Sequence, residues 1–241
     1  MMKPIYKPSG KAAEYGDFCV NIYTGCNHGC IYCYAPGVMH KTREEFEDVK
    51  ARPGLLEALE AQLASGAYAG KLIHLCFTCD PYPAPPVDTS ITREVIMAIK
   101  AAGAHVQILT KGGERAQRDF DLLDGEDWFG VTVTSDSYRG LKIEPRAAMT
   151  CERLFTLDAA FIRGIKTWVS CEPVYDPWVV YSVFEKSHAD LFRIGKLNYF
   201  PSDIDWGKFG RTCEAILKSK RRNYLIKAEL RAEMEKEGDG K

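Results

Sequence analysis

Three cysteines near the N-terminus have a spacing that suits an iron–sulfur cluster. Cys26, Cys30 and Cys33 lie in the stretch GCNHGCIYC, with three and two residues between them. Three thiolates can bind three irons of a [4Fe-4S] cube, which leaves the fourth iron without a protein ligand. The spacing therefore predicts a cluster whose open iron can be chelated by an amine and a carboxylate.

Two other interpretations of these cysteines remain open. A zinc ion would need His28 as its fourth ligand, but His28 lies inside the short first loop, where reaching an ion shared with all three thiols would strain the chain. Three buried, unligated cysteines are disfavoured because Gly25, Asn27 and Gly29 stand between and beside them, and these residue types are typical of loops.

The elements that must position this loop alternate along the chain. Six apolar or β-branched runs are expected to be buried strands, each followed by a helix. The strands are predicted at residues 18–24, 72–79, 105–110, 129–135, 167–172 and 191–196, and the helices at 53–65, 92–102, 115–123, 146–163, 177–188 and 206–220. This order predicts an α/β fold with a partial (β/α)6 parallel barrel, and a doubly wound open sheet is the alternative. In either fold, functional side chains lie at the carboxyl ends of the strands.

The 241 residues are expected to form one core domain with a short segment at each end. Residues 1–17 are expected as an N-terminal extension and residues 18–217 as the core. Residues 218–241 are charged and poor in apolar side chains, which predicts a solvated helix followed by a frayed end. The basic run at 218–222 is the one local candidate for phosphate contacts.

The composition narrows the class of protein. Hydrophobic residues make up 46% and charged residues 27%, as in ordinary globular proteins. The net charge is −1, whereas proteins that mainly bind nucleic acid usually carry an excess of basic residues. No apolar run approaches the roughly 18 residues of a membrane span, and the N-terminus lacks the apolar region of a secretory signal. We therefore expect a cytoplasmic protein whose nine cysteines are reduced, in which clustered cysteines are metal ligands or redox groups.

On these motifs the chain resembles the radical S-adenosylmethionine (SAM) superfamily, whose signature is a CxxxCxxC loop with an aromatic residue, here Tyr32, before the last cysteine. The longer string GCNHGCIYCYA is similar to the branch that contains spore photoproduct lyase. Later motifs match that branch in order, and the resemblance spans about residues 16–200. They are TCDPYP (78–83) with ITR (91–93), LTK (109–111) with RD (118–119), VTVTSDS (131–137) with IEPR (143–146), and CEPV (171–174).

The resemblance implies both cofactors and chemistry. A [4Fe-4S] cluster passes an electron to SAM, and the resulting 5′-deoxyadenosyl radical abstracts hydrogen from a substrate. The substrate is not identified, and a nucleotide or nucleic acid is left open. A one-electron donor such as flavodoxin or ferredoxin is the implied partner, and a monomer is expected. The alternative is a non-catalytic iron–sulfur protein that senses redox state or assists another enzyme, but the later motifs count against it.

Residue by residue, the resemblance implies a SAM site at the strand ends. Tyr32 is expected near the adenine, and Thr78 and Asp80 near the methionine amine, although the family's usual GGE motif is absent. Lys111 is expected to pair with the methionine carboxylate, as a point charge suited to that group. Ser135 is expected to hydrogen-bond the ribose.

Further candidates follow from position. Glu144 and Glu172 are candidates for polar contacts to cofactor or substrate. Cys79 and Cys171 are expected at strand ends facing the site, where a thiol can donate a hydrogen atom. Phe77 occupies the position of the lyase's hydrogen-donating cysteine, which disfavours the lyase's own reaction here.

Cys76 and Cys79 form a CxxC pair, but residues three apart on a strand point to opposite faces, so no shared metal is expected. The cysteines expected to be small buried hydrophobic residues are Cys19, Cys76, Cys151 and Cys213.

Overall fold

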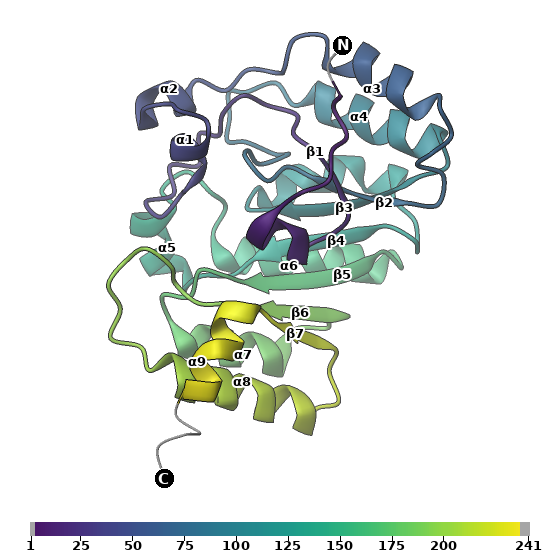
Figure 1. Ribbon diagram of the computed structural model, residues 1–241. Helices are drawn as coiled ribbons and strands as arrows, with labels where there is room; N and C mark the ends of the chain where they lie inside the picture. The colour runs from purple at the N-terminus through teal and green to yellow at the C-terminus, as the bar shows by residue number, and fades with distance from the viewer. Residues whose placement is uncertain (1–2, 237–241) are drawn as a thin grey trace.

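Seven parallel strands form one sheet in the order in which they occur along the chain (Figure 1). The computed structural model describes residues 3–236. Every neighbouring pair of strands is parallel, and the two end strands do not pair with each other within the described residues, so the barrel is open. The strands are β1 (Phe18–Val20), β2 (Leu72–Leu75), β3 (His105–Thr110), β4 (Trp128–Thr132), β5 (Lys166–Cys171), β6 (Leu191–Ile194) and β7 (Tyr224–Ile226).

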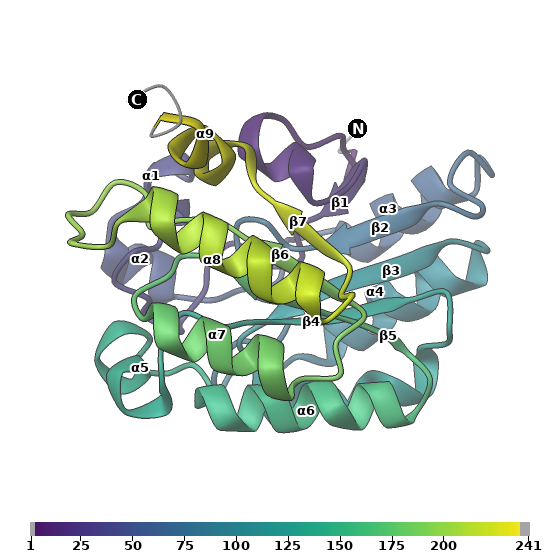
Figure 2. The same cartoon turned by 90° about the horizontal axis from the view of Figure 1, so that it is seen from below.

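Helices connect the strands, and α6, α7 and α8 lie along the outside of the curved sheet (Figure 2). Apolar side chains at helical spacing, such as Val95, Ile96 and Ile99 of α4, are fully buried in the core between helix and sheet. The α-helices are α1 (Ala35–Val38), α2 (Arg43–Glu47), α3 (Leu55–Leu63), α4 (Ser90–Ala101), α5 (Ser137–Ile143), α6 (Thr150–Ile162), α7 (Pro177–Lys186), α8 (Trp206–Ser219) and α9 (Ala228–Lys236). The 3-10 helices are η1 (Gly10–Glu14) and η2 (Gly113–Leu122).

Trp168 of β5 lies against the neighbouring strand β4. Its indole N–H donates to the carbonyl of Ile108, 3.0 Å away, across β4. A Cβ at Gly130 would lie 2.3 Å from the indole ring, so only glycine leaves room for this ring. The pairing of a bulky ring with a glycine fixes the packing between β3, β4 and β5.

The predicted parallel α/β fold is confirmed, with corrections to individual elements. Three strands are shorter than predicted: β1 ends at Val20, β2 at Leu75 and β4 at Thr132. The prediction was too long because the apolar residues continue into the loops that follow these strands. The predicted helix at 115–123 is a 3-10 helix. Helix α5 was not predicted; it begins where the Asp136 side chain accepts from the backbone N–H of Arg139.

The expectation of a solvated tail from residue 218 is wrong for the part that the structure describes. Strand β7 pairs with β6, and α9 packs against α8. Three apolar side chains spaced four residues apart, Ile226, Leu230 and Met234, are buried. This narrow stripe is easily overlooked in a charged segment, but it is sufficient to dock a short helix. Residues 237–241 of the predicted tail lie outside the described residues.

Within residues 3–236, no helix combines the length and the apolar character needed to cross a lipid bilayer.

Candidate active site

The cysteine loop follows β1 and leads into α1. Gly25 is the first residue of the motif. A Cβ at this position would lie 2.1 Å from the carbonyl oxygen of Phe46, so only glycine fits. The same carbonyl accepts a hydrogen bond from the backbone N–H of Cys26 at 2.9 Å. Arg43 of α2 donates to the carbonyls of Cys30 (3.0 Å) and Ile31 (2.7 Å). Helix α2 therefore fixes the backbone at both the first and the second cysteine.

Two other segments hold the loop from different sides. The Asn27 side chain forms a pair of 2.8 Å hydrogen bonds with the backbone of Ala84. The IEPR segment contributes a hydrogen bond from the backbone N–H of Ile31 to the carbonyl of Ile143 (2.9 Å), and Arg146 donates to the Asn27 carbonyl. The motifs that follow β2 and β4 therefore buttress the cysteine loop directly.

His28 is not available as a fourth zinc ligand. It is buried, with Nδ1 3.5 Å from an Asp80 carboxylate oxygen and Nε2 3.2 Å from an Arg115 guanidinium nitrogen. Burial lowers the pKa of His28 to about 4 against the opposing effect of Asp80, so the imidazole is neutral at pH 7. Both ring nitrogens face other partners.

The thiols themselves are spread more widely than one zinc ion requires. Thiolates on a tetrahedral zinc, with Zn–S bonds of about 2.3 Å, lie about 3.8 Å apart. In the described residues the three sulfur atoms of Cys26, Cys30 and Cys33 do not all lie within 4.8 Å of one another. The positions of the three thiols therefore do not match a single tetrahedral zinc ion.

Asp80 connects the ends of β2 and β3 beside the loop. Its carboxylate accepts from the Thr110 hydroxyl (2.5 Å) and from the backbone N–H groups of Lys111 and Tyr82 (2.8 Å each). Burial would raise the pKa of Asp80, but His28 and these donors outweigh it and lower the pKa. The carboxylate is therefore charged, and its contacts are with the protein. The predicted contact between Asp80 and the methionine amine stays a prediction.

Tyr32 is held from behind by two buried charged residues. Its hydroxyl donates to Glu144, whose other carboxylate oxygen lies 2.5 Å from Arg153. Arg153 also donates to the carbonyls of Ala148 (2.8 Å) and Thr132 (3.0 Å). Burial opposes the charge on Glu144, but Arg153 and Lys111 outweigh it and lower the pKa of Glu144. Sequence reasoning missed Arg153, because a lone arginine in an amphipathic helix carries no motif.

Lys111 lies at the end of β3 with its ammonium 5.7 Å from the centre of the Tyr32 ring. Burial disfavours its charge, yet the electrostatic influence of Cys30 and Glu144 outweighs burial and raises the pKa of Lys111. The ammonium has no ion-pair partner within residues 3–236. A half-buried, charged and unpaired ammonium beside the cysteine loop is suited to bind a carboxylate.

A cavity of about 500 Å³ opens at the carboxyl ends of β2 to β5. It brings together five of the predicted site residues: Tyr32, Cys79, Asp80, Lys111 and Glu172. The other predicted non-cysteine site residues, Thr78, Ser135 and Glu144, do not line it.

Ser135 does not line the cavity. Strand β4 ends at Thr132, which does line it, three residues before Ser135. The predicted contact between Ser135 and the ribose stays a prediction. The buried Ser135 hydroxyl donates to the carbonyl of Asp136 at 3.2 Å, and so it stabilises the loop. Thr78 lies near the cavity wall, and its buried hydroxyl has no hydrogen-bond partner among the described residues.

Cys76 and Cys79 both line the cavity, which corrects the expectation that they point apart. Strand β2 has ended at Leu75, and Cys76 has a φ of 73°, so strand geometry no longer applies. Burial alone would raise the pKa of Cys79, but hydrogen bonds from the Cys76 thiol and the Tyr23 N–H lower it. Burial raises the pKa of Cys76, so Cys76 keeps the proton. By contrast, Cys171 is fully buried in the core and does not line the cavity.

The far side of the cavity is closed by residues from both ends of the chain. Glu172 accepts from the Tyr15 hydroxyl at 3.0 Å and pairs with Lys227 at 2.6 Å. Lys227 also lies 3.3 Å from Glu14. A Cβ at Gly195 would lie 2.6 Å from the Glu172 carboxylate carbon, so this glycine makes room for the pair. Sequence reasoning missed Tyr15 and Lys227 because they lie in segments that were expected to flank the core.

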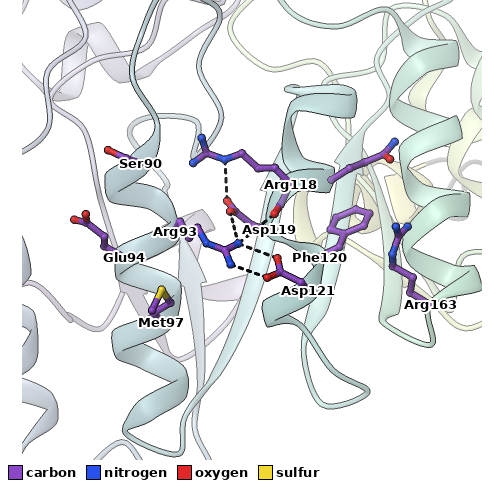
Figure 3. Close-up of a pocket in the computed structure, with 10 residues that line it drawn as sticks. Ser90, Arg93, Glu94, Met97, Arg118, Asp119, Phe120, Asp121 and Arg163 are labelled. Carbon is purple, nitrogen blue, oxygen red and sulfur yellow. Dashed lines mark hydrogen bonds and ion pairs between the residues drawn. The ribbon is translucent and has the colours of Figure 1, made fainter.

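A second hollow of about 550 Å³ lies between α4 and η2 (Figure 3). Arg93 forms two hydrogen bonds to Asp121 (2.8 and 2.6 Å) and contacts the buried Asp119 at 3.2 Å. Arg118 reaches the same Asp119 at 3.5 Å. The ITR and RD motifs therefore meet in an ion-pair cluster that ties η2 to α4, away from the cysteine loop.

Comparisons with known proteins agree with this geometry. A family model described as the radical SAM superfamily matches residues 20–175. An uncharacterized protein of Methanocaldococcus jannaschii is 27% identical over 177 residues, which cover 71% of this chain and 64% of that protein. An uncharacterized protein of Mycobacterium tuberculosis is 28% identical over 116 residues, which cover 44% and 32%. The chain thus spans less than two thirds of the length of either relative.

Solved structures share the fold. Spore photoproduct lyase in complex with a dinucleoside spore photoproduct superposes with a TM-score of 0.68 at 13% identity, covering 91% of this chain and 78% of that one. SuiB of Streptococcus suis bound to S-adenosylmethionine superposes with a TM-score of 0.65 at 10% identity, covering 86% and 49%. At these identities the likeness establishes the fold alone.

Proposed function

The chain belongs to the radical SAM superfamily, and from this premise we propose that Cys26, Cys30 and Cys33 hold its [4Fe-4S] cluster and that SAM binds in the adjoining cavity. Lys111 is the observation that carries the proposal. Its ammonium, which has no ion-pair partner within the described residues, lines the cavity 5.7 Å from the ring of Tyr32, a residue of the cysteine loop. A radical SAM enzyme needs a carboxylate-binding group at this place, whereas a purely structural cluster does not.

The cluster and SAM, when bound, supply a 5′-deoxyadenosyl radical that abstracts hydrogen from a substrate. The chain's own residues bind and orient. Lys111 holds the methionine carboxylate, and Tyr32, fixed by Glu144, presents its ring beside the adenine. Aromatic and aliphatic side chains of the cavity exclude water, which protects a reactive intermediate.

The thiols of Cys76 and Cys79 support a second step. Because both thiols line the cavity, we extend the hydrogen-donor assignment from Cys79 to Cys76 as well. A thiol can return a hydrogen atom to a substrate radical, while a thiolate cannot. Burial raises the pKa of Cys76, which keeps this thiol protonated and able to donate.

The alternative of a non-catalytic iron–sulfur protein lacks support from the site. The cavity is lined by Tyr32 of the cysteine loop, although Cys26, Cys30 and Cys33 themselves do not line it. A non-catalytic protein requires neither a cavity beside the cysteine loop nor an unpaired lysine in it. A nucleic-acid substrate also finds little support in the basic run at 218–222, because Lys220 pairs with Glu185 at 2.5 Å and Arg222 donates to the Ser187 carbonyl at 2.9 Å. A one-electron donor such as flavodoxin or ferredoxin is the proposed partner, and a monomer in the cytoplasm stays our proposal.

Anaerobic reconstitution tests this function. The protein is loaded with iron and sulfide, reduced with dithionite and incubated with SAM, and 5′-deoxyadenosine is measured by chromatography. We expect 5′-deoxyadenosine and methionine in equal amounts. A protein that binds a cluster but forms no 5′-deoxyadenosine would support the non-catalytic alternative.

A further inference from the structure

His74 is a buried polar side chain that the proposed function leaves unused. It lies on β2, is 1% exposed and lines the cavity. Neither ring nitrogen has a hydrogen-bond partner within the described residues. Burial, helped by the positive charge of Arg193, lowers the pKa of His74 to about 3, so the imidazole is neutral at pH 7. A neutral imidazole offers one donor and one acceptor, and buried groups of this kind nearly always have partners.

Aromatic rings surround this imidazole. Phe77 stacks on it with ring centres 4.3 Å apart and planes 22° apart. Tyr15 lies 5.9 Å away and Trp168 lies 6.4 Å away, both at steeper angles. Tyr15 and Phe77 also line the cavity. Three aromatic rings therefore surround the His74 imidazole, which favours a flat ligand over a flexible chain.

Two charged side chains at this end of the cavity, Glu172 and Lys227, compensate each other. Glu172 is paired with Lys227 at 2.6 Å, and Lys227 is shared with Glu14 at 3.3 Å. The Arg193 guanidinium is placed over the rings of Tyr15 (5.2 Å) and Trp168 (5.1 Å) and donates to the Glu14 carbonyl. A cation placed beside His74 would meet the positive charge of Arg193, and Glu172 is already paired with Lys227, so a cation is disfavoured. The Arg193 guanidinium is stacked over two rings, so an uncharged group can bind beside His74 without displacing it.

We propose that His74 is a substrate-binding residue that hydrogen-bonds an uncharged planar group, an amide or lactam ring, which lies against Phe77 and Tyr15. The inference rests on the proposed function in one respect, that the cavity is where the substrate meets SAM. Ligand pockets range from about 300 to 1,000 Å³, and this one, at about 500 Å³, also has to hold SAM. The substrate therefore inserts only a small group beside His74.

Binding of small probes to the reconstituted, SAM-loaded protein tests this inference. Three probes are used. The first is 2-pyridone, which is a neutral planar lactam. Toluene is a ring of similar size without polar atoms, and benzoate is its anionic counterpart. Isothermal titration calorimetry measures affinity, and nuclear magnetic resonance of protein labelled with ¹⁵N-histidine reports on the ring nitrogens. We expect 2-pyridone to bind about tenfold more tightly than toluene or benzoate and to shift the ¹⁵N signals of His74.

His74→Phe identifies the signals and keeps an aromatic ring for Phe77 to stack on. We expect it to reduce the affinity for 2-pyridone about tenfold and to leave toluene binding within twofold. His188→Phe, at an exposed position, is the control and leaves all three affinities unchanged. The inference would be overturned if 2-pyridone and toluene bound with equal affinity, or if benzoate bound more tightly than 2-pyridone. It would also be overturned if no probe shifted the His74 signals, which would mean that only water reaches the ring.

The inference and the proposed function can fail separately. Cleavage of SAM by the wild-type protein without selective 2-pyridone binding would leave the function standing and remove the assignment of His74. Selective binding at His74 without any cleavage of SAM would remove the function and keep the binding site.

Discussion

Lys111 places its ammonium 5.7 Å from the centre of the Tyr32 ring, and the hydroxyl of that ring hydrogen-bonds Glu144. The two residues come from different segments, the end of β3 and the cysteine loop. The buried Glu144–Arg153 pair behind the tyrosine holds it in place. This arrangement ties the proposed carboxylate-binding group to the loop that carries the three cysteines.

Replacing Lys111 should separate SAM binding from cluster binding. Lys111→Ala removes a charge-assisted hydrogen bond worth about 1.5–3 kcal/mol, so SAM affinity should fall about ten- to a hundredfold while iron content stays unchanged. Lys111→Arg should restore the SAM affinity only in part, since the planar guanidinium group of arginine differs in shape from the compact ammonium of lysine. Equilibrium dialysis with SAM measures the affinity, and Lys186→Ala, on the exposed side of α7, is the control. Unchanged affinity in Lys111→Ala would show that another group holds the carboxylate.

His74 should make stability depend on pH. Its folded pKa of about 3 lies below its ordinary value of 6.5, so the unfolded chain binds the proton first as the pH falls. The contribution of His74 to the free energy of unfolding is complete above pH 6.5. It is lost between pH 6.5 and about 3, at about 1.4 kcal/mol per pH unit. Urea unfolding at several pH values gives the free energy of unfolding as a function of pH. Between pH 6.5 and about 3, this free energy should fall less steeply with decreasing pH in His74→Phe than in the wild type, by about 1.4 kcal/mol per pH unit. The exposed control His188→Phe should show the wild-type pH dependence. Equal slopes in wild type and His74→Phe would contradict burial of a neutral imidazole.

The Cys76–Cys79 pair should show coupled thiol reactivity. The hydrogen bond from Cys76 lowers the pKa of Cys79, so Cys79 should be alkylated by iodoacetamide at lower pH than an ordinary thiol. Cys76→Ala removes that donor and should shift the alkylation profile of Cys79 to higher pH. Mass spectrometry of labelled peptides follows each cysteine, with the exposed Cys151 as internal reference. A Cys79 profile that does not respond to Cys76→Ala would show that the two thiols do not interact.

Gly130→Ala should destabilise the barrel. The added methyl would lie 2.3 Å from the Trp168 ring, so the indole has to move and lose its hydrogen bond to Ile108. Overpacking of this kind costs about 1–3 kcal/mol. Gly37→Ala is the matched control, because a Cβ there meets no atom within 4 Å. Chemical denaturation should show a lower unfolding free energy for Gly130→Ala alone, and equal losses in both variants would refute the packing argument.

The sequence predicted those features that depend on local pattern. The spacing of Cys26, Cys30 and Cys33 led to the family, and the resemblance of the LTK motif to that family led to Lys111, which lines the cavity. The alternation of apolar runs predicted a parallel sheet, which is confirmed. These features are visible because each is encoded within a few consecutive residues.

Features that depend on contacts between distant segments were not predicted. Tyr15 and Lys227 meet at Glu172 although 212 positions separate them (227 minus 15), and nothing local marks either one. Arg153 was hidden in an ordinary helix, and His74 in an apolar strand. The proximity of Cys76 and Cys79 was missed because the strand ends at Leu75, a boundary that an apolar run does not reveal.

The central claim is that three cysteines bind a four-iron cluster, and the metal content of purified variants tests it most directly. Iron and acid-labile sulfide should reach about four per chain in the anaerobically reconstituted protein, with broad visible absorption. Cys26→Ala, Cys30→Ala and Cys33→Ala should each lose the cluster, while Cys151→Ala and Cys213→Ala keep it. One zinc per chain without visible absorption, or full iron content after loss of Cys26, Cys30 or Cys33, would contradict the account.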